Sequence, residues 1–251
     1  MCGIVGYWSE KNFSNGVIKN MCDQIKHRGP DAQSAWSDKA RGVFLGHQRL
    51  SILDLSDAGK QPMVSSCGRY IIVFNGEIYN HLELRNLLSQ ERADLNWNGH
   101  SDTETLLACI VFYGVDAALR LLNGMFAFAL FDKKYNELIL ARDRVGEKPL
   151  YFGYLNKTFF FGSELKALKC HPAWGGEINQ NAISSYLRHN YVPTPLSIYK
   201  GIHKLPSGHY LRVKNIGKEL SDPISYWDKE KHFNQEIAVA TDNELIDELE
   251  R

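Results

Sequence analysis

Four runs of strand-forming residues decide the fold: GMFAFALFD at 124–132, ELILARD at 137–143, PLYFGYL at 149–155 and TFFFGSE at 158–164. Apolar residues fill these runs almost continuously, as in strands that are buried on both faces. Because only short turns separate the runs, they predict an antiparallel meander. Such strands need cover on both sides, which two stacked sheets with helices outside them would provide.

Further strands and helices are predicted on both sides of this block. Upstream strand signals are CGIVGYW (2–8), two short pieces around a polar break in GVFLGHQRLSILD (42–54), and RYIIVFNGEIY (69–79), with HRGPDAQ (27–33) as an irregular loop. Helices are expected near 14–27, 163–169 and 179–189, and in NHLELRNLLSQ (80–90) and SDTETLLACIVFYG (101–114). Asn80 and Ser101 each precede a glutamate by three residues, which is the spacing of a capping box. Two strand-like pieces follow residue 192.

The composition indicates a soluble cytoplasmic protein without a nucleic-acid or membrane partner. Lys+Arg and Asp+Glu both total 29 among 251 residues, so there is no basic excess for nucleic acid or an anionic membrane. No apolar run approaches the roughly 18 residues of a membrane-spanning helix, and no signal-peptide pattern is evident. The five cysteines form no CxxC pair and are odd in number, which favours neither a zinc site nor a disulfide framework.

Cys2 directly follows the initiator methionine. Removal of Met1 would leave Cys2 with a thiol and a free α-amine, whose reference pKa is about 7.7–8.0. The neutral amine can act as a base for the thiol through a water, as in enzymes with an N-terminal threonine. Position 2 alone does not distinguish this role from that of an apolar residue near a chain end.

The dipeptide Asn75-Gly76 follows the apolar run from Tyr70 to Phe74. Asn-Gly is the commonest hairpin turn signal, but a helix signal follows here instead of a partner strand. A strand end leading into a helix can present an Asn amide and a Gly N–H in one direction, as an oxyanion hole requires. Glu77 beside them could receive a substrate ammonium group.

Two more charged residues have alternative interpretations. Arg49 in GHQRLSILD could form a surface salt bridge, or it could clamp a substrate carboxylate through two hydrogen bonds. Asp102 could cap a helix beside Ser101, or it could bind a substrate amine. Neither residue alone decides between these roles.

Considered together and in order, these segments resemble the glutaminase domain of asparagine synthetase, among the class II (N-terminal nucleophile) glutamine amidotransferases. The resemblance covers residues 2–215 and is carried by CGIVGYW, HRGPD (27–31), HQRLSILDLS (47–56), FNGEIYN (74–80), the acid in SDTE (101–104), GMFAFALFD, ARDRVGEKPLYFG (141–153) and GSELKAL (162–168). One departure is His100, where relatives often have glycine. It leaves Asp102 in place and concerns only the local shape of the loop.

The resemblance implies an α+β, four-layer αββα N-terminal-nucleophile hydrolase fold. It also implies a role for each matching residue. Cys2 would be the nucleophile and its amine the general base, and Asn75 and Gly76 would form the oxyanion hole. The implied binding residues for glutamine are Arg49 on the α-carboxylate, Ile52 and Leu53 through backbone groups, and Glu77 and Asp102 on the α-ammonium.

The implied activity is hydrolysis of glutamine to glutamate and ammonia through a thioester, with no metal or cofactor in this half. In the family, a second domain uses ATP and Mg²⁺ to adenylate a carboxylate acceptor, aspartate in asparagine synthetases, and ammonia reaches that domain through an internal tunnel. Its SGGxDS loop does not occur in this chain. We therefore expect a glutaminase domain at 2–215 and a connecting segment at 216–251, in which ELIDELER resembles the start of a missing C-terminal synthetase domain.

Several alternatives stay open at this point. The segment 191–211 resembles asparagine synthetase-like enzymes encoded with bacterial surface-polysaccharide genes, whose acceptor would be a sugar uronic acid. A non-catalytic domain that keeps the fold is disfavoured by the retained candidate residues. A different superfamily enzyme, such as a phosphoribosylamine-forming amidotransferase or an N-terminal hydrolase, is disfavoured by RLSILD and NGEIYN. A homodimer is left open, and exposed apolar surface is expected at GSELKAL and in the 140s, where the family places its inter-domain interface.

Overall fold

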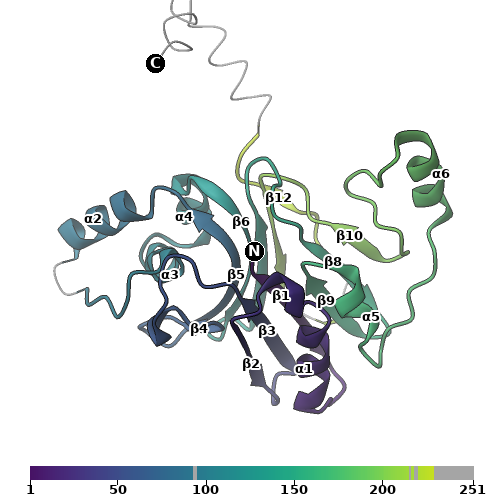
Figure 1. Cartoon of the computed structure of the whole chain (residues 1–251), viewed down its shortest axis with the longest axis horizontal. Helices are drawn as coiled ribbons and strands as arrows, with labels where there is room; N and C mark the ends of the chain where they lie inside the picture. Colours follow the sequence, from purple (N-terminus) through teal and green to yellow (C-terminus); the bar gives the residue numbers. More distant parts are fainter. Residues whose placement is uncertain (93–94, 215, 218–219, 229–251) are drawn as a thin grey trace, which may run out of the picture.

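Two six-stranded antiparallel sheets, stacked face to face, form the centre of the molecule (Figure 1). In this computed structural model, the residues described are 1–92, 95–214, 216–217 and 220–228. The strand order is β10–β8–β9–β1–β3–β2 in the first sheet and β12–β11–β7–β6–β5–β4 in the second. The first sheet contains β1 (Gly3–Ser9), β2 (Ala32–Asp38), β3 (Val43–Arg49), β8 (Tyr151–Leu155), β9 (Thr158–Gly162) and β10 (Ile202–Lys204). The second contains β4 (Met63–Val64), β5 (Tyr70–Ile78), β6 (Gly124–Asp132), β7 (Glu137–Arg142), β11 (His209–Val213) and β12 (Ile224–Ser225).

Helices cover the outer face of each sheet (Figure 1). On the first sheet lie α1 (Asn15–Asp23) and α5 (Leu165–Lys169), and on the second lie α2 (His81–Glu91), α3 (Asp102–Tyr113) and α4 (Val115–Leu121). The helix α6 (Gln180–His189) projects away from the sandwich and buries only Ala182. Two short 3₁₀ turns, η1 (Lys26–Arg28) and η2 (Asp57–Gly59), complete the elements of the described residues.

Alternation along the central strands explains why they are apolar throughout. In β5, Ile71 and Val73 face the core between the two sheets, whereas Ile72 and Phe74 face the core beneath the helices. Successive side chains of a strand point to opposite faces, so a strand between two apolar layers needs apolar residues at both parities. The predicted four-layer αββα arrangement therefore follows from the sequence pattern.

The predicted meander is wrong, because its four strands belong to two different sheets. β6 and β7 form a hairpin in the second sheet, and β8 and β9 form another in the first. The connection between the hairpins crosses the sandwich and is fixed by Asp143. Its carboxylate accepts hydrogen bonds from the backbone N–H groups of Phe126 and Lys148, at 3.2 and 3.0 Å.

The structure also corrects several local predictions. VFLGHQR (43–49) is one continuous strand, β3, whose polar residues His47 and Gln48 are buried, and β2 begins inside the expected loop at Ala32. The helix α4 was not predicted. Ser101 caps α3 by accepting a hydrogen bond from the Glu104 N–H, but Asn80 does not cap α2. The Asn80 side chain bonds Leu121 and Asn123 instead.

Exposed apolar surface lies only in part where it was expected. In the 140s Val145 is exposed, whereas Leu140 and Ala141 are buried, and in GSELKAL the apolar residues Ala167 and Leu168 are buried. Between residues 165 and 200, large exposed apolar side chains gather along α6 and the residues next to it: Ile178, Ile183, Tyr186, Leu187 and Tyr191. Within the described residues, every helix is too short or too polar to cross a membrane. The ELIDELER segment lies outside the described residues.

Candidate active site

One open cavity of about 80 Å³ brings together all eight residues predicted for the site: Cys2, Arg49, Ile52, Leu53, Asn75, Gly76, Glu77 and Asp102. Both sheets contribute to it. Cys2 precedes β1 and Arg49 ends β3 in the first sheet, Asn75, Gly76 and Glu77 belong to β5 in the second, and Asp102 begins α3. The cavity therefore lies where the ends of the two sheets meet the start of a helix. The side chains of Ile52 and Leu53 are exposed at its rim.

The Cys2 thiol is half-buried and held by the backbone of Leu50. The Leu50 N–H donates to Sγ at 3.4 Å, and the Leu50 carbonyl oxygen lies 3.5 Å from Sγ. Arg28 fixes the main chain at the same point by donating from Nε to the Cys2 carbonyl, at 3.0 Å. Burial raises the pKa of the Cys2 thiol, and the Leu50 N–H opposes this rise in part. A base is therefore needed to generate the thiolate near neutral pH.

Arg49 is not a surface residue, since its side chain is buried against the loop that follows β3. Nη1 donates to the carbonyl of Ser56 at 3.1 Å, and Nη2 donates to the carbonyl of Asp54. Within the described residues, Arg49 forms no ion pair, so its positive charge is available to a ligand in the cavity. Gly59 is packed so closely on the guanidinium that a Cβ at this position would clash with it.

Asn75 and Gly76 lie inside β5, not at its end as predicted. Both pair with β6, opposite Ala127 and Phe126. The Asn75 side chain is 1% exposed, and neither its amide nitrogen nor its amide oxygen has a hydrogen-bond partner in the described part of the chain. An unpaired buried amide costs about 1–3 kcal/mol, a cost that a ligand in the cavity would offset.

The backbone N–H of Gly76 points to the same side as the cavity. In an antiparallel strand, residues of equal parity direct their N–H groups to one side. Two residues away on either side, Phe74 N–H donates to Gln61 Oε1 at 2.6 Å and Ile78 N–H donates to Asp102 Oδ2 at 2.9 Å. Gly76 N–H lies between these two N–H groups, both of which are already hydrogen-bonded. A Cβ on Gly76 would lie 2.7 Å from the Cα of Phe126, so the close strand pairing requires glycine.

The acidic side of the cavity consists of Glu77 and Asp102. Because Ser101 caps α3, the Asp102 carboxylate is free to face β5, where it accepts from Ile78 N–H. Thr103 Oγ1 lies 3.4 Å from its other oxygen. Burial raises the pKa of Asp102, and the negative charge of Glu77 acts in the same direction. Two carboxylates in a partly buried site suit a cationic group of a ligand.

Several lining residues were not predicted: Asp54, Gly59, Gln61, Ser101, Thr103, Met125 and Lys148. Gln61 bridges β5 and α3, because its Nε2 donates to Thr103 Oγ1 at 3.2 Å while its Oε1 accepts from Phe74. Lys148 is 4% exposed, and its Nζ lies 3.1 Å from the Met1 sulfur. Asp54 lies in the motif HQRLSILDLS and Lys148 in ARDRVGEKPLYFG, so these two residues had a sequence signal, whereas Gln61 lies in none of the motifs.

A model of the glutamine amidotransferase domain matches residues 1–227 of this chain. The chain belongs to the glutamine amidotransferase family. Relatives of this amidotransferase domain include a putative glutamine-hydrolysing asparagine synthetase 2 of Methanocaldococcus jannaschii, 36% identical, with 91% of this chain aligned to 47% of the relative. Glutamine-hydrolysing asparagine synthetase 3 of Bacillus subtilis is 34% identical over 92% of this chain and 38% of its own length. Amidase chry2 of Gibberella zeae is 32% identical over 92% of this chain and 35% of its own length.

The amidotransferase domain thus spans half or less of the length of these relatives, and it resembles the glutaminase part of asparagine synthetases. Its fold matches the solved glutamine phosphoribosylpyrophosphate amidotransferase of B. subtilis, in complex with ADP and GMP. The TM-score is 0.66 over 90% of this chain and 49% of that structure, at 17% sequence identity. This match confirms the predicted α+β, four-layer αββα fold of the N-terminal-nucleophile hydrolases.

Proposed function

We propose that this domain hydrolyses glutamine to glutamate and ammonia through a thioester on Cys2. The single observation that carries the proposal is the buried amide of Asn75, which has no partner among the described residues and lies beside the Gly76 N–H in the cavity that Cys2 also lines. Two such donors at one cavity suit an oxyanion that forms during acyl transfer. The cation of Arg49, which forms no ion pair with the residues that the structure describes, and the carboxylates of Glu77 and Asp102 complement the charged α-groups of an amino acid.

In the proposed reaction, the α-amine of Cys2 takes the thiol proton through a water, and the thiolate attacks the side-chain amide carbon of glutamine. The carbon–oxygen π electrons move onto the oxygen, which Asn75 and Gly76 stabilise. Collapse of this intermediate breaks the carbon–nitrogen bond, and the α-ammonium of Cys2 protonates the leaving ammonia. Water then attacks the thioester while the amine accepts its proton, which releases glutamate and restores the thiol.

We further propose that the ammonia serves an ATP-dependent synthetase domain that amidates aspartate. The names of the relatives and their greater length support this proposal. ATP and Mg²⁺ are proposed for that partner domain, as the family resemblance implies, and the glutaminase half is proposed to need neither. We also propose that the synthetase domain contacts the apolar face of α6, where Leu187 is exposed. The homodimer and the cytoplasmic location stay predictions.

Mass spectrometry of the intact N-terminus combined with a glutaminase assay tests the hydrolysis. We expect active protein to lack Met1 and the Cys2→Ala variant to release no glutamate. Activity in protein that retains Met1 would contradict the free-amine mechanism, and glutamate release by Cys2→Ala would contradict the thioester. For the acceptor, the full-length protein is supplied with glutamine, ATP and either aspartate or a uronic acid. Asparagine formation is expected, whereas amidation of the uronic acid alone would support the alternative acceptor.

A further inference from the structure

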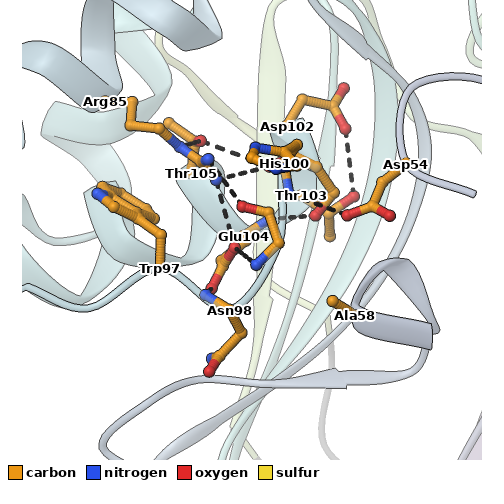
Figure 2. A network of polar contacts seen from close by, with 12 residues as sticks. Asp54, Ala58, Arg85, Trp97, Asn98, His100, Asp102, Thr103, Glu104 and Thr105 are labelled. Carbon is orange, nitrogen blue, oxygen red and sulfur yellow. Dashed lines mark hydrogen bonds and ion pairs between the residues drawn. The ribbon is translucent and has the colours of Figure 1, made fainter. Parts of the chain in front are cut away.

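The Asp54 carboxylate ties together two segments that border the cavity (Figure 2). Its Oδ1 accepts hydrogen bonds from the backbone N–H and the hydroxyl of Ser56, at 2.8 and 2.6 Å. Its Oδ2 accepts from the backbone N–H of His100 at 2.9 Å. The Ser56 hydroxyl, and then the His100 N–H, hold the pKa of Asp54 at about 2. Asp54 is therefore a carboxylate throughout the neutral range, with all three contacts made to its charged form.

The same short loop holds the guanidinium of Arg49. The two carbonyl groups that accept from Arg49 belong to Asp54 and Ser56, the residues that the Asp54 carboxylate fixes. A shift of this loop would therefore move Arg49 as well. Because an arginine clamp requires both of its N–H groups to be aimed at a carboxylate, a small rotation would weaken the clamp.

The second segment that Asp54 contacts is a turn at residues 98–101, which Arg85 and Glu104 stabilise. Arg85 Nη1 donates to the Gly99 carbonyl at 2.8 Å, and its guanidinium stacks over the Trp97 ring at 4.1 Å. Glu104 accepts from the backbone N–H groups of Asn98 and Gly99, at 2.7 and 3.0 Å. Figure 2 shows these side chains around the turn, which presents His100 N–H to Asp54. Since the contact is made by the backbone, the position tolerates histidine.

We propose that Asp54 is a positioning residue for substrate binding, and that Arg85 acts on the same step through Asp54. The inference rests on the proposed function, in which Arg49 binds the α-carboxylate of glutamine. Asp54 holds the loop that aims Arg49, and Arg85 holds the turn that anchors Asp54. Neither residue touches the reacting amide, so their loss weakens glutamine binding and leaves the chemical step unchanged.

The Asp54→Asn variant tests the tie selectively. Its amide oxygen can still accept from Ser56, but its NH₂ group would face the His100 N–H, donor against donor. We expect the KM for glutamine to rise about tenfold, as for loss of one charge-assisted hydrogen bond, with kcat within about twofold of the wild type. Asp57→Asn is the matched control, because Asp57 is an exposed acid in the same loop that pairs only with Lys60 among the described residues. This control should keep the wild-type KM.

Arg85→Met and the double variant test the route through Asp54. If Arg85 acts through the Asp54–His100 contact, Arg85→Met raises KM by itself but adds little to Asp54→Asn, within about twofold. Equal KM values for Asp54→Asn and Asp57→Asn, in folded protein with unchanged unfolding midpoints, would overturn the proposal. Multiplicative effects in the double variant would overturn the role of Arg85. An inactive wild type would instead refute the glutaminase function itself, so the two failures are distinguishable.

Discussion

The backbone N–H of Ile78 donates to Asp102 Oδ2 at 2.9 Å, which joins the end of β5 to the first residue of α3. This hydrogen bond aims a buried carboxylate at the cavity, two residues beyond the Gly76 N–H. It also separates the two roles considered for an acid at this helix start. Ser101 caps the helix, and Asp102 is left to interact with the strand and with a ligand.

The first prediction concerns the pH dependence of glutamine hydrolysis. Because burial raises the pKa of Asp102, this carboxylate takes up a proton at a higher pH than an ordinary aspartate. Protonation removes the charge that we propose binds the α-ammonium, so kcat/KM should fall on the acid side. Asp102→Asn should lower kcat/KM by roughly 30-fold or more at neutral pH and remove this acid limb. Asp116 of α4, a half-buried acid that does not line the cavity, gives the control variant Asp116→Asn, whose profile should match the wild type. An unchanged acid limb in Asp102→Asn would assign it to another group.

The second prediction separates activity from stability at Asn75. Replacing Asn75 by alanine removes the proposed oxyanion donor, and kcat should fall about 10²–10³-fold. The same change removes a buried amide without partners among the described residues, so the free energy of unfolding should stay the same or rise. Glutaminase kinetics and urea unfolding of the same preparation test both parts. A variant that loses stability and activity together would point to a structural amide.

Features of the fold that depend on local sequence patterns could be predicted, whereas those that depend on contacts between distant residues could not. Apolar runs identified the buried strands, but a meander and two separate hairpins produce the same runs. The choice between them depends on Asp143, whose carboxylate reaches Phe126 on one strand and Lys148 in the crossover. Such contacts between distant residues leave no local pattern.

The candidate site was predicted through its resemblance to a family, and its supporting contacts were not. Asn75 was placed at a strand end because a polar residue follows an apolar run, yet β5 continues to Ile78 with its polar part against the cavity. Asp54 and Arg85 gave no signal of their connection, since they meet only through the backbone of the turn at 98–101.

The third prediction concerns Gly76. A Cβ at this position would clash with the Met125 carbonyl and lie 2.7 Å from the Cα of Phe126, both of which are backbone atoms that cannot rotate away. Gly76→Ala should therefore lower the free energy of unfolding by about 2 kcal/mol or more. Gly16→Ala provides the control. Gly16 lies in the first turn of α1, and the atom nearest to a Cβ at this position would be the Ser14 hydroxyl oxygen at 3.4 Å. That variant should be neutral or slightly more stable. Equal unfolding midpoints for the two variants would contradict the tight strand pairing.

The fourth prediction concerns acid denaturation through two buried histidines, His47 and His171. Burial lowers the pKa of each from 6.5 to about 4. Between these values the unfolded chain binds protons that the folded chain does not, so the free energy of unfolding falls as pH decreases from 6.5 to 4. Each histidine should contribute about 3 kcal/mol to this loss.

His47→Gln isolates one of these contributions. His47 Nε2 lies 3.0 Å from the Phe74 carbonyl, so it is the protonated nitrogen and donates, and a glutamine amide can donate in its place. The variant should therefore fold at neutral pH and lose about half of the pH dependence below 6.5, measured by urea unfolding at several pH values. The exposed His189 provides the control His189→Gln, which should follow the wild-type curve. If the free energy of unfolding of His47→Gln kept the full wild-type dependence on pH, the destabilisation by acid would arise from other groups, because a glutamine side chain does not bind a proton in this pH range.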